Sequence, residues 1–160
     1  RVAELHGDYY NRHWGFGLFF EAKVATELAE FLGRCEQGRD GFWTLRRNGR
    51  VEGAIAIDGL KAADAEAHLR WFIVSPGLKG KGWGRRLLAE AVSFCDRQRY
   101  ERIGLWTFAG LDAARRLYES FGFQLVSQEE GRRWGTPVIE QRFERCRPSS
   151  GQSGPDPAKR

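Results

Sequence analysis

One stretch of the chain, residues 72–88, constrains the fold more than any other. An apolar run at 72–74 ends before Pro76, and a loop alternating glycine with lysine then opens an amphipathic helix. Glycine lets a backbone approach a ligand closely and turn its N–H groups toward it. The helix N-terminus adds about half a positive charge and unpaired amide donors. This order of elements predicts a cradle for a phosphate-bearing ligand.

The spacing of the glycines excludes two common phosphate loops. A P-loop starting at Gly77 reaches Gly82, but Trp83 then stands where the lysine is required. A dinucleotide fingerprint fails because Arg85 or Leu87 occupies the position of its third glycine. A glycine-rich turn with solvated charges and no ligand is the structural alternative.

Two segments of the chain, in the order in which a known family has them, carry a family resemblance. Residues 79–84, Lys-Gly-Lys-Gly-Trp-Gly, resemble motif A (R/Q-x-x-G-x-G/A) of the GCN5-related N-acetyltransferases, the GNAT family. Residues 111–123 resemble the family's N-x-x-A-x-x-L-Y-x-x-x-G-F signature. Lys79 and Leu111 depart from these patterns, and Leu111 replaces an asparagine that contacts the coenzyme in many relatives. The resemblance is strong over about 50–145.

The resemblance implies acetyl-CoA as the acetyl donor and direct attack by an amine in a ternary complex. Tyr118 takes the position of the family's acid, which protonates the leaving thiolate; its structural alternative is a tyrosine that packs on the sheet. Backbone amides near Phe72 and Ile73 would polarise the thioester carbonyl. The expected coenzyme-binding residues are Phe72, Ile73, Val74, Lys79, Gly80, Lys81, Gly82, Trp83, Gly84 and Arg85.

The acceptor and the base are less constrained by the sequence. The acceptor is expected to be a primary amine of a small molecule or of a protein. The aromatic residues of segment 14–20 and Trp134 predict the walls of its pocket; the alternative is that they pack the first helix onto the sheet. A general base is needed, because an alkyl amine of pKa about 10 is mostly charged at neutral pH. The candidates are Glu21, Glu52, Glu66, His68 and Glu140. A non-catalytic acyl-CoA sensor is the alternative function.

The apolar periodicities predict an α/β domain over residues 1–146 and a disordered tail at 147–160. The resemblance implies a mixed, mostly antiparallel sheet with helices on both faces. It also implies a splay between the family's fourth and fifth strands, here 68–74 and 103–108. A hairpin turn is expected at Asn48-Gly49. The expected helices are 24–34, 82–99 and 111–121, and the expected strands are 42–47, 51–57, 68–74, 103–108, 123–127 and 138–143.

Composition limits the partners. The net charge of +5 comes from 26 basic and 21 acidic side chains, without a basic stripe interleaved with aromatics, so no direct nucleic-acid contact is expected. Three widely spaced cysteines suit reduced thiols in the cytoplasm. No metal-ligand spacing and no membrane-spanning stretch is visible. Residues 10–21 resemble the opening of GNAT domains fused behind a MarR-type regulator, which implies such a fusion; the alternative is a free-standing acetyltransferase trimmed at its start. A homodimer stays open.

Overall fold

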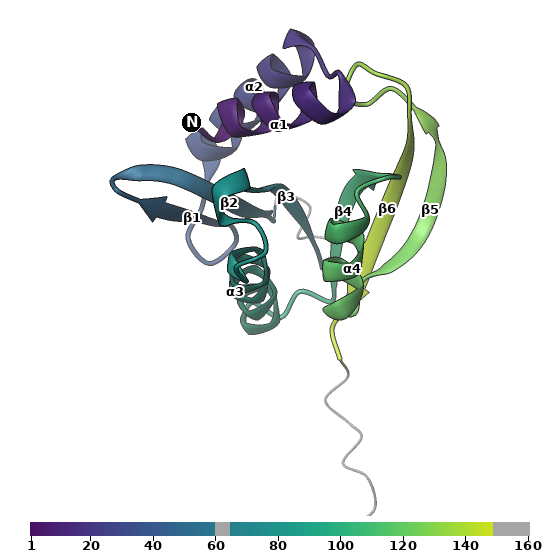
Figure 1. Cartoon of the computed structure of the whole chain (residues 1–160). Helices are drawn as coiled ribbons and strands as arrows, with labels where there is room; N and C mark the ends of the chain where they lie inside the picture. The colour runs from purple at the N-terminus through teal and green to yellow at the C-terminus, as the bar shows by residue number, and fades with distance from the viewer. Residues whose placement is uncertain (60–64, 149–160) are drawn as a thin grey trace, which may run out of the picture.

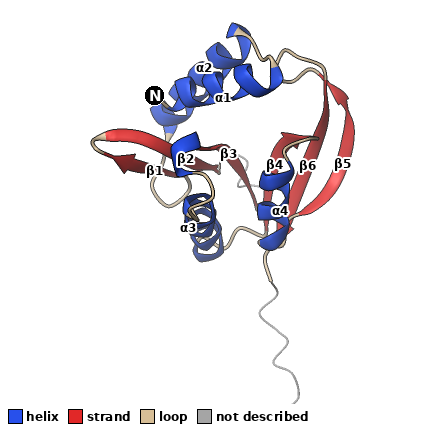
Figure 2. Ribbon diagram, viewed as in Figure 1, coloured by secondary structure: helices blue, strands red, loops and turns tan. Residues whose placement is uncertain are grey.

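The computed structural model describes residues 1–59 and 65–148, which form one six-stranded sheet flanked by helices (Figure 1). The strands follow the order β1-β2-β3-β4-β6-β5, and every neighbouring pair is antiparallel except β3–β4 (Figure 2). The elements are α1 (Val2–Trp14), α2 (Leu18–Arg34), β1 (Gly41–Arg47), β2 (Arg50–Asp58), β3 (Glu66–Val74), the short 3-10 helix η2 (Pro76–Leu78), α3 (Trp83–Arg97), β4 (Arg102–Phe108), α4 (Asp112–Ser120), β5 (Gln124–Gly131) and β6 (Val138–Cys146). The α/β class and the mixed, mostly antiparallel sheet are confirmed.

The splay lies between β3 and β4. These strands pair in parallel only where they begin, through Glu66–Arg102, Ala67–Ile103 and His68–Gly104. Beyond His68 the two strands share no further paired residues, so their carboxyl ends diverge. The predicted splay is confirmed, and it opens toward the loops that follow both strands.

Each face of the sheet has its own hydrophobic core. α3 and α4 cover one face, where Leu88, Cys95 and Phe143 are fully buried. α1 and α2 cover the other, where Phe16, Phe31 and Phe108 pack together. Figure 1 shows the two helix pairs on opposite sides of the strands, which confirms helices on both faces.

β3 contains a bulge that overturns one sequence expectation. Strict alternation predicts that Leu69, Trp71 and Ile73 face the same side. Instead Leu69 packs with α3 and α4, whereas Trp71 and Ile73 pack with α1 and α2. The pairing register with β2 shifts between Ala54 and Ala56, and Trp71 adopts a left-handed φ of 49°. An extra residue in the strand reverses its alternation there.

Several element boundaries differ from the sequence expectation. α1 was not expected as a helix, although its buried Val2, Leu5 and His6 have helical spacing. α2 begins at Leu18 rather than at residue 24, and β5 extends to Gly131 instead of ending at residue 127. Asn48 and Gly49 both have positive φ (51° and 76°), which confirms the hairpin turn. The loop expected at 60–65 lies outside the described residues up to 64, as does the tail beyond 148.

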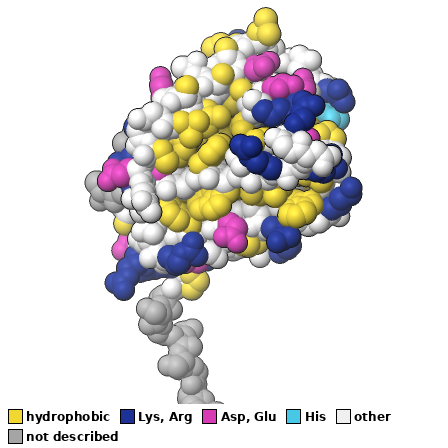
Figure 3. All heavy atoms as spheres, turned by 90° about the vertical axis from the view of Figure 1, so that its left-hand side faces the viewer, with side chains coloured by type: hydrophobic (Ala, Val, Ile, Leu, Met, Phe, Trp, Pro, Cys, Tyr) yellow, Lys and Arg dark blue, Asp and Glu magenta, His cyan; other side chains and the backbone are white. Residues whose placement is uncertain are grey.

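The molecular surface is mixed in character. On the side turned to the viewer in Figure 3, hydrophobic side chains gather in a band with Lys and Arg side chains around it. Leu18 and Phe19 at the start of α2 are the most exposed large apolar residues among those described. No helix of the described chain is long and apolar enough to cross a membrane.

Candidate active site

The glycine loop and the start of α3 form the predicted cradle, residues 79–85. Gly80 and Gly82 have φ values of 71° and 79°, a left-handed conformation that favours glycine. A Cβ built on either residue would meet nothing within 4 Å, so the space in front of the loop is open. Among the described residues, no hydrogen-bond acceptor pairs with the backbone N–H groups from Gly80 to Arg85. The cradle therefore presents free amide donors at a helix N-terminus, as an anion site requires.

The cations of the cradle contact different neighbours. Lys79 places its Nζ 3.7 Å from the ring centroid of Tyr9, which joins the loop to α1. Lys81 donates from Nζ to the carbonyl oxygen of Gly77 at 3.0 Å. Arg85 donates from Nη2 to Ser120 Oγ at 3.2 Å, across to α4. Lys79 and Arg85 therefore bracket the cradle between α1 and α4.

A cavity of about 1120 Å³ runs from the cradle into the splay. Seven of the predicted site residues line it: Phe72, Ile73, Val74, Lys79, Gly80, Gly84 and Tyr118. The other four, Lys81, Gly82, Trp83 and Arg85, belong to the cradle but do not line the cavity. A Cβ on Gly84 would sit 3.5 Å from Phe72 Cζ and 3.6 Å from Leu117 Cδ2, so this glycine lies at the floor of the splay.

The edge of β3 that faces the splay keeps free backbone groups. Ser75 donates its N–H to the carbonyl oxygen of Glu52 on β2 at 2.8 Å. Because successive residues of a strand direct their N–H groups to opposite sides, the N–H of Val74 points away from β2, into the splay. The same alternation turns the N–H of Ile73 toward β2. Phe72 and Val74 are thus the residues whose amides are available to a ligand there.

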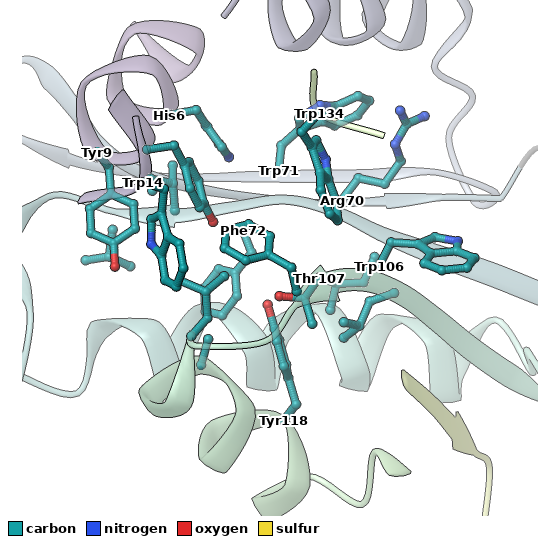
Figure 4. A pocket seen from close by; sticks show the side chains of 18 of the residues that line it. His6, Tyr9, Trp14, Arg70, Trp71, Phe72, Trp106, Thr107, Tyr118 and Trp134 are labelled. Atoms are coloured by element: carbon teal, nitrogen blue, oxygen red, sulfur yellow. The ribbon is translucent and has the colours of Figure 1, made fainter. Parts of the chain in front are cut away.

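Tyr118 lies on α4 at the centre of the cavity. Its ring packs between Phe72, Phe123 and Phe143, with centroid distances of 6.1, 5.9 and 6.3 Å. Burial raises the pKa of Tyr118 well above its ordinary value, so the hydroxyl keeps its proton. Figure 4 shows this hydroxyl directed toward Thr107 and Phe72.

Three further polar side chains around Tyr118 were missed by the sequence analysis. His6 donates from Nδ1 to the carbonyl oxygen of Val2 at 2.9 Å, which leaves Nε2 as a lone-pair acceptor in the neutral ring. No described residue is a hydrogen-bond partner of His6 Nε2, the Tyr10 hydroxyl or the Thr107 hydroxyl. Ser75 Oγ is the one described side-chain polar atom that is both sealed from solvent and unpartnered, so these three atoms open into the cavity that their residues line. Burial lowers the pKa of His6 to about 4.

Of the five candidate bases, only His68 lines the cavity. Its Nε2 lies 3.1 Å from Glu66 Oε1, and Glu66 also accepts from Arg142. Glu140 instead holds the loop between β5 and β6, where it accepts from the backbone N–H of Arg133 at 2.7 Å. Glu21 packs against the backbone of α1 at Gly7, and Glu52 lies beside Ser75, outside the cavity.

The end of the cavity farthest from the cradle is rich in cations and indoles. We call it the arginine end, and it lies where β3 and β4 are still close. Figure 4 shows Tyr9 and Trp14 at one side of the cavity and Arg70, Trp106 and Trp134 at the other, with Phe72, Thr107 and Tyr118 between them. The arginine end comprises Lys23, Glu27, His68, Arg70, Trp106, Arg133, Trp134 and Arg142. Among the described residues no group of acidic, histidine and cysteine side chains could hold a metal ion.

Comparison with solved structures supports the same architecture. The acetyltransferase yncA from Salmonella typhimurium, solved with acetyl-CoA, superposes with a TM-score of 0.71 at 18% identity, covering 98% of this chain and 91% of that one. The ribosomal-protein-S18-alanine N-acetyltransferase from Escherichia coli gives a TM-score of 0.67 at 19% identity, covering 96% and 92%. At these identities the likeness concerns the fold.

Sequence relatives point to acetyl transfer. An uncharacterized N-acetyltransferase of Methanocaldococcus jannaschii is 23% identical over 120 residues, 72% of this chain and 53% of the relative. The N-acetylaspartate synthetase of Danio rerio is 33% identical over 89 residues, 56% of this chain and 31% of the relative. The chain thus spans about half of the length of the first relative and about a third of the second. The model of the acetyltransferase (GNAT) family matches residues 2–123, most of the chain. The chain therefore belongs to the GNAT family of acetyltransferases.

Proposed function

We propose that the protein transfers the acetyl group of acetyl-CoA to a primary amine of a small molecule. The observation that carries the proposal is the single cavity that joins the cradle, through the splay, to the polar groups around Tyr118. We assign this activity to one domain, residues 1–146. A fused MarR-type regulator, a homodimer, a cytoplasmic location and a disordered tail at 147–160 stay predictions of the sequence.

The chain's residues fit the coenzyme in two places. The free N–H groups of Gly80 to Arg85 suit a pyrophosphate, and the open space before Gly80 and Gly82 gives it room. The unpaired edge of β3 at Phe72 and Val74 suits the amides of a pantetheine arm, which would bind as an added strand does. When bound, acetyl-CoA supplies an acetyl group activated as a thioester.

Tyr118 is assigned as the hydrogen-bond donor to the leaving sulfur. Because its raised pKa keeps the hydroxyl protonated throughout the physiological range, it can always donate a hydrogen bond to a sulfur that gains negative charge. A thiol has an ordinary pKa of about 8.5, below that of tyrosine, so full proton transfer from Tyr118 would be uphill. Its contribution is therefore the stabilisation of charge by a preorganised donor.

Two histidines are assigned to the amine. His68 lines the cavity with Nε2 3.1 Å from Glu66 Oε1, so the carboxylate positions an imidazole that can take a proton from an incoming ammonium group. His6 stays neutral because burial lowers its pKa to about 4, so Nε2 can accept a hydrogen bond from the amine and help orient its lone pair.

The proposal is tested first by binding and turnover. Calorimetry should detect CoA binding and no binding of NAD, and release of free thiol from acetyl-CoA should appear with members of an amine panel. Failure to bind CoA would overturn the proposal. Binding of CoA without thiol release for any amine would instead favour the acyl-CoA sensor.

Tyr118→Phe tests the assigned donor. We expect kcat to fall by about 100-fold, a typical loss when one preorganised hydrogen-bond donor is removed, while the Kd for CoA stays the same. Tyr100→Phe is the matched control, because the Tyr100 hydroxyl donates to the carbonyl oxygen of Arg39 and lies outside the cavity. Equal losses of turnover and of CoA affinity in Tyr118→Phe would assign the hydroxyl a structural role.

A further inference from the structure

The arginine end carries more positive charge than an amine acceptor alone would require. Four of its lining side chains are cationic, Lys23, Arg70, Arg133 and Arg142, and Glu27 is the one carboxylate that lines it among the described residues. Glu27 is itself engaged, because it pairs with Lys23 and accepts from Arg70 Nη2 at 2.6 Å. A ligand in this part of the cavity therefore meets a surplus of cations.

The carboxylates that balance these cations lie behind them. Asp58, Glu66 and Glu140 pair with Arg70, Arg142 and Arg133 respectively, and none of the three lines the cavity. The arginines thus turn their charged side chains to the cavity while their partners fix them from the protein side. Because the carboxylates lie on the protein side of each pair, the positive member faces the cavity, which suits an anion better than a polyamine.

Among these cations, Arg133 is held in the position that best suits binding of an anion. Glu140 accepts from its backbone N–H at 2.7 Å and from its Nε at 3.2 Å, so one buried carboxylate fixes both the loop and the side chain. The guanidinium carbon lies 3.9 Å from the ring centroid of Trp106, which holds the group flat. Within the described part of the chain, its two terminal nitrogens have no hydrogen-bond partner. This pair of nitrogens, which we call the fork of the guanidinium, is therefore free to bind a ligand.

The neighbouring groups give the anion a defined place. Trp134, the next residue in the loop, lines the cavity, and its ring centroid lies 5.3 Å from that of Phe108. Arg142 approaches Trp106 at 5.7 Å from the ring centroid. A planar guanidinium with a free fork matches the two oxygens of a carboxylate.

We propose that the acceptor is a free amino acid, whose carboxylate binds Arg133 at the arginine end while its amine lies near Tyr118. The inference rests on the proposed acetyl transfer to a small-molecule amine, and it names the class of that amine. The amino group of a polypeptide chain lacks an adjacent free carboxylate and would not use this fork.

The test compares each amino acid with its own carboxamide. Glycine, L-phenylalanine, L-aspartate and 4-aminobutyrate, each paired with its carboxamide (the α-carboxamide for L-aspartate), are titrated into the protein saturated with CoA and then assayed with acetyl-CoA. At least one acid should bind about 10- to 100-fold more tightly than its amide, as one charge-assisted pair provides. The amine of an α-carboxamide is less basic and so more often neutral; a preference for an α-amino acid therefore cannot arise from amine reactivity.

Arg133→Gln should remove this preference, mainly through KM and Kd for the acid, and leave the amide unaffected. Arg132→Gln is the matched control, because Arg132 is exposed and does not line the cavity. Equal binding of acids and amides by the wild-type protein, or an Arg133→Gln loss shared by both, would overturn the inference. Because calorimetry does not depend on turnover, an acid preference in a protein that releases no thiol would sustain the inference and refute the enzymatic function.

Discussion

At the scale of single residues, His6 shows how burial keeps an imidazole neutral. Its ring is buried on α1, Nδ1 is bound to Val2, and desolvation lowers its pKa from 6.5 to about 4. A buried histidine whose charged form is disfavoured remains neutral and keeps its acceptor nitrogen across the working pH range. The same energetics make the folded state sensitive to acid.

We predict that this histidine weakens the fold as the pH falls from 6.5 toward 4. In this range the unfolded chain binds a proton at residue 6 that the folded chain does not, so the free energy of unfolding decreases with falling pH. The contribution reaches about 3 kcal/mol at pH 4, since one pKa unit corresponds to 1.36 kcal/mol.

Urea denaturation of the wild-type protein and of His6→Gln at pH 4, 5, 6 and 7 measures this effect. Glutamine cannot titrate, so the variant should lose less stability than the wild type over this range. Parallel pH profiles for the two proteins would contradict the prediction. His13→Gln on the same helix, at an exposed position, is the control.

The site residues differ in how far the sequence could reveal them. Tyr118 and the cradle glycines stand within contiguous motifs, so their positions in the chain alone made them candidate site residues. His6 and Arg133 lie in segments with no motif, and they meet the cavity only because α1 and the β5–β6 loop fold over the sheet. Glu140 illustrates the opposite error: a carboxylate that is a base candidate by its type is occupied in holding a loop.

At the scale of elements, the glycine loop allows a test of the proposed pyrophosphate site. Gly82→Asp should weaken CoA binding by at least about 10-fold, because its carboxylate would enter the open space of the cradle and repel a pyrophosphate. Gly82→Asn has nearly the same shape and also tolerates positive φ, so the difference between the two variants isolates charge.

Calorimetry with CoA on both variants gives the comparison. Gly49→Asp serves as the control for backbone strain, because Gly49 also has a positive φ (76°) and open surroundings, yet it lies in the β1–β2 turn. If the Asp and Asn variants bound CoA as well as the wild type, residue 82 would not border the pyrophosphate site.

Elements were predictable where local signals agreed. The Asn48-Gly49 turn and the strand-loop-helix order of the cradle follow from backbone preferences of nearby residues. The bulge in β3 could not be predicted from nearby residues. Trp71 is an unusual residue for positive φ, and its conformation depends on packing against Phe31 and on Arg70 above its ring. The length of β5 was missed since its exposed polar residues show no apolar alternation.

At the scale of the whole molecule, the sheet consists of two halves with a narrow junction. β1, β2 and β3 form one half, and β4, β6 and β5 form the other, joined by the three residue pairs at the start of β3 and β4. Under the proposed function, the coenzyme would lie in the gap and contact both halves. Its binding should therefore stabilise the whole domain.

We predict a concentration-dependent rise in Tm with CoA. At a free concentration of 100 times Kd the stabilisation is about 2.7 kcal/mol, which corresponds to about 5–10 °C for a domain of this size. Hydrogen exchange should slow at residues 72–74 and at the cradle. Adenosine, which lacks the pyrophosphate and the pantetheine arm, is the control ligand, and an equal shift with adenosine would contradict binding across the gap.

The bulge at Trp71 has a consequence for the wall of the cavity. With one extra residue in the strand, residues before and after position 71 obey opposite odd–even rules, so Leu69 and Phe72 share a side although they are three positions apart. If the strand kept all its residues but lost the bulge, uniform alternation would turn Phe72 from the side of Tyr118 to the side of α1, because Leu69 and Phe72 are three positions apart. The wall of the cavity is thus fixed by the backbone conformation at position 71 as well as by the side chain of Phe72.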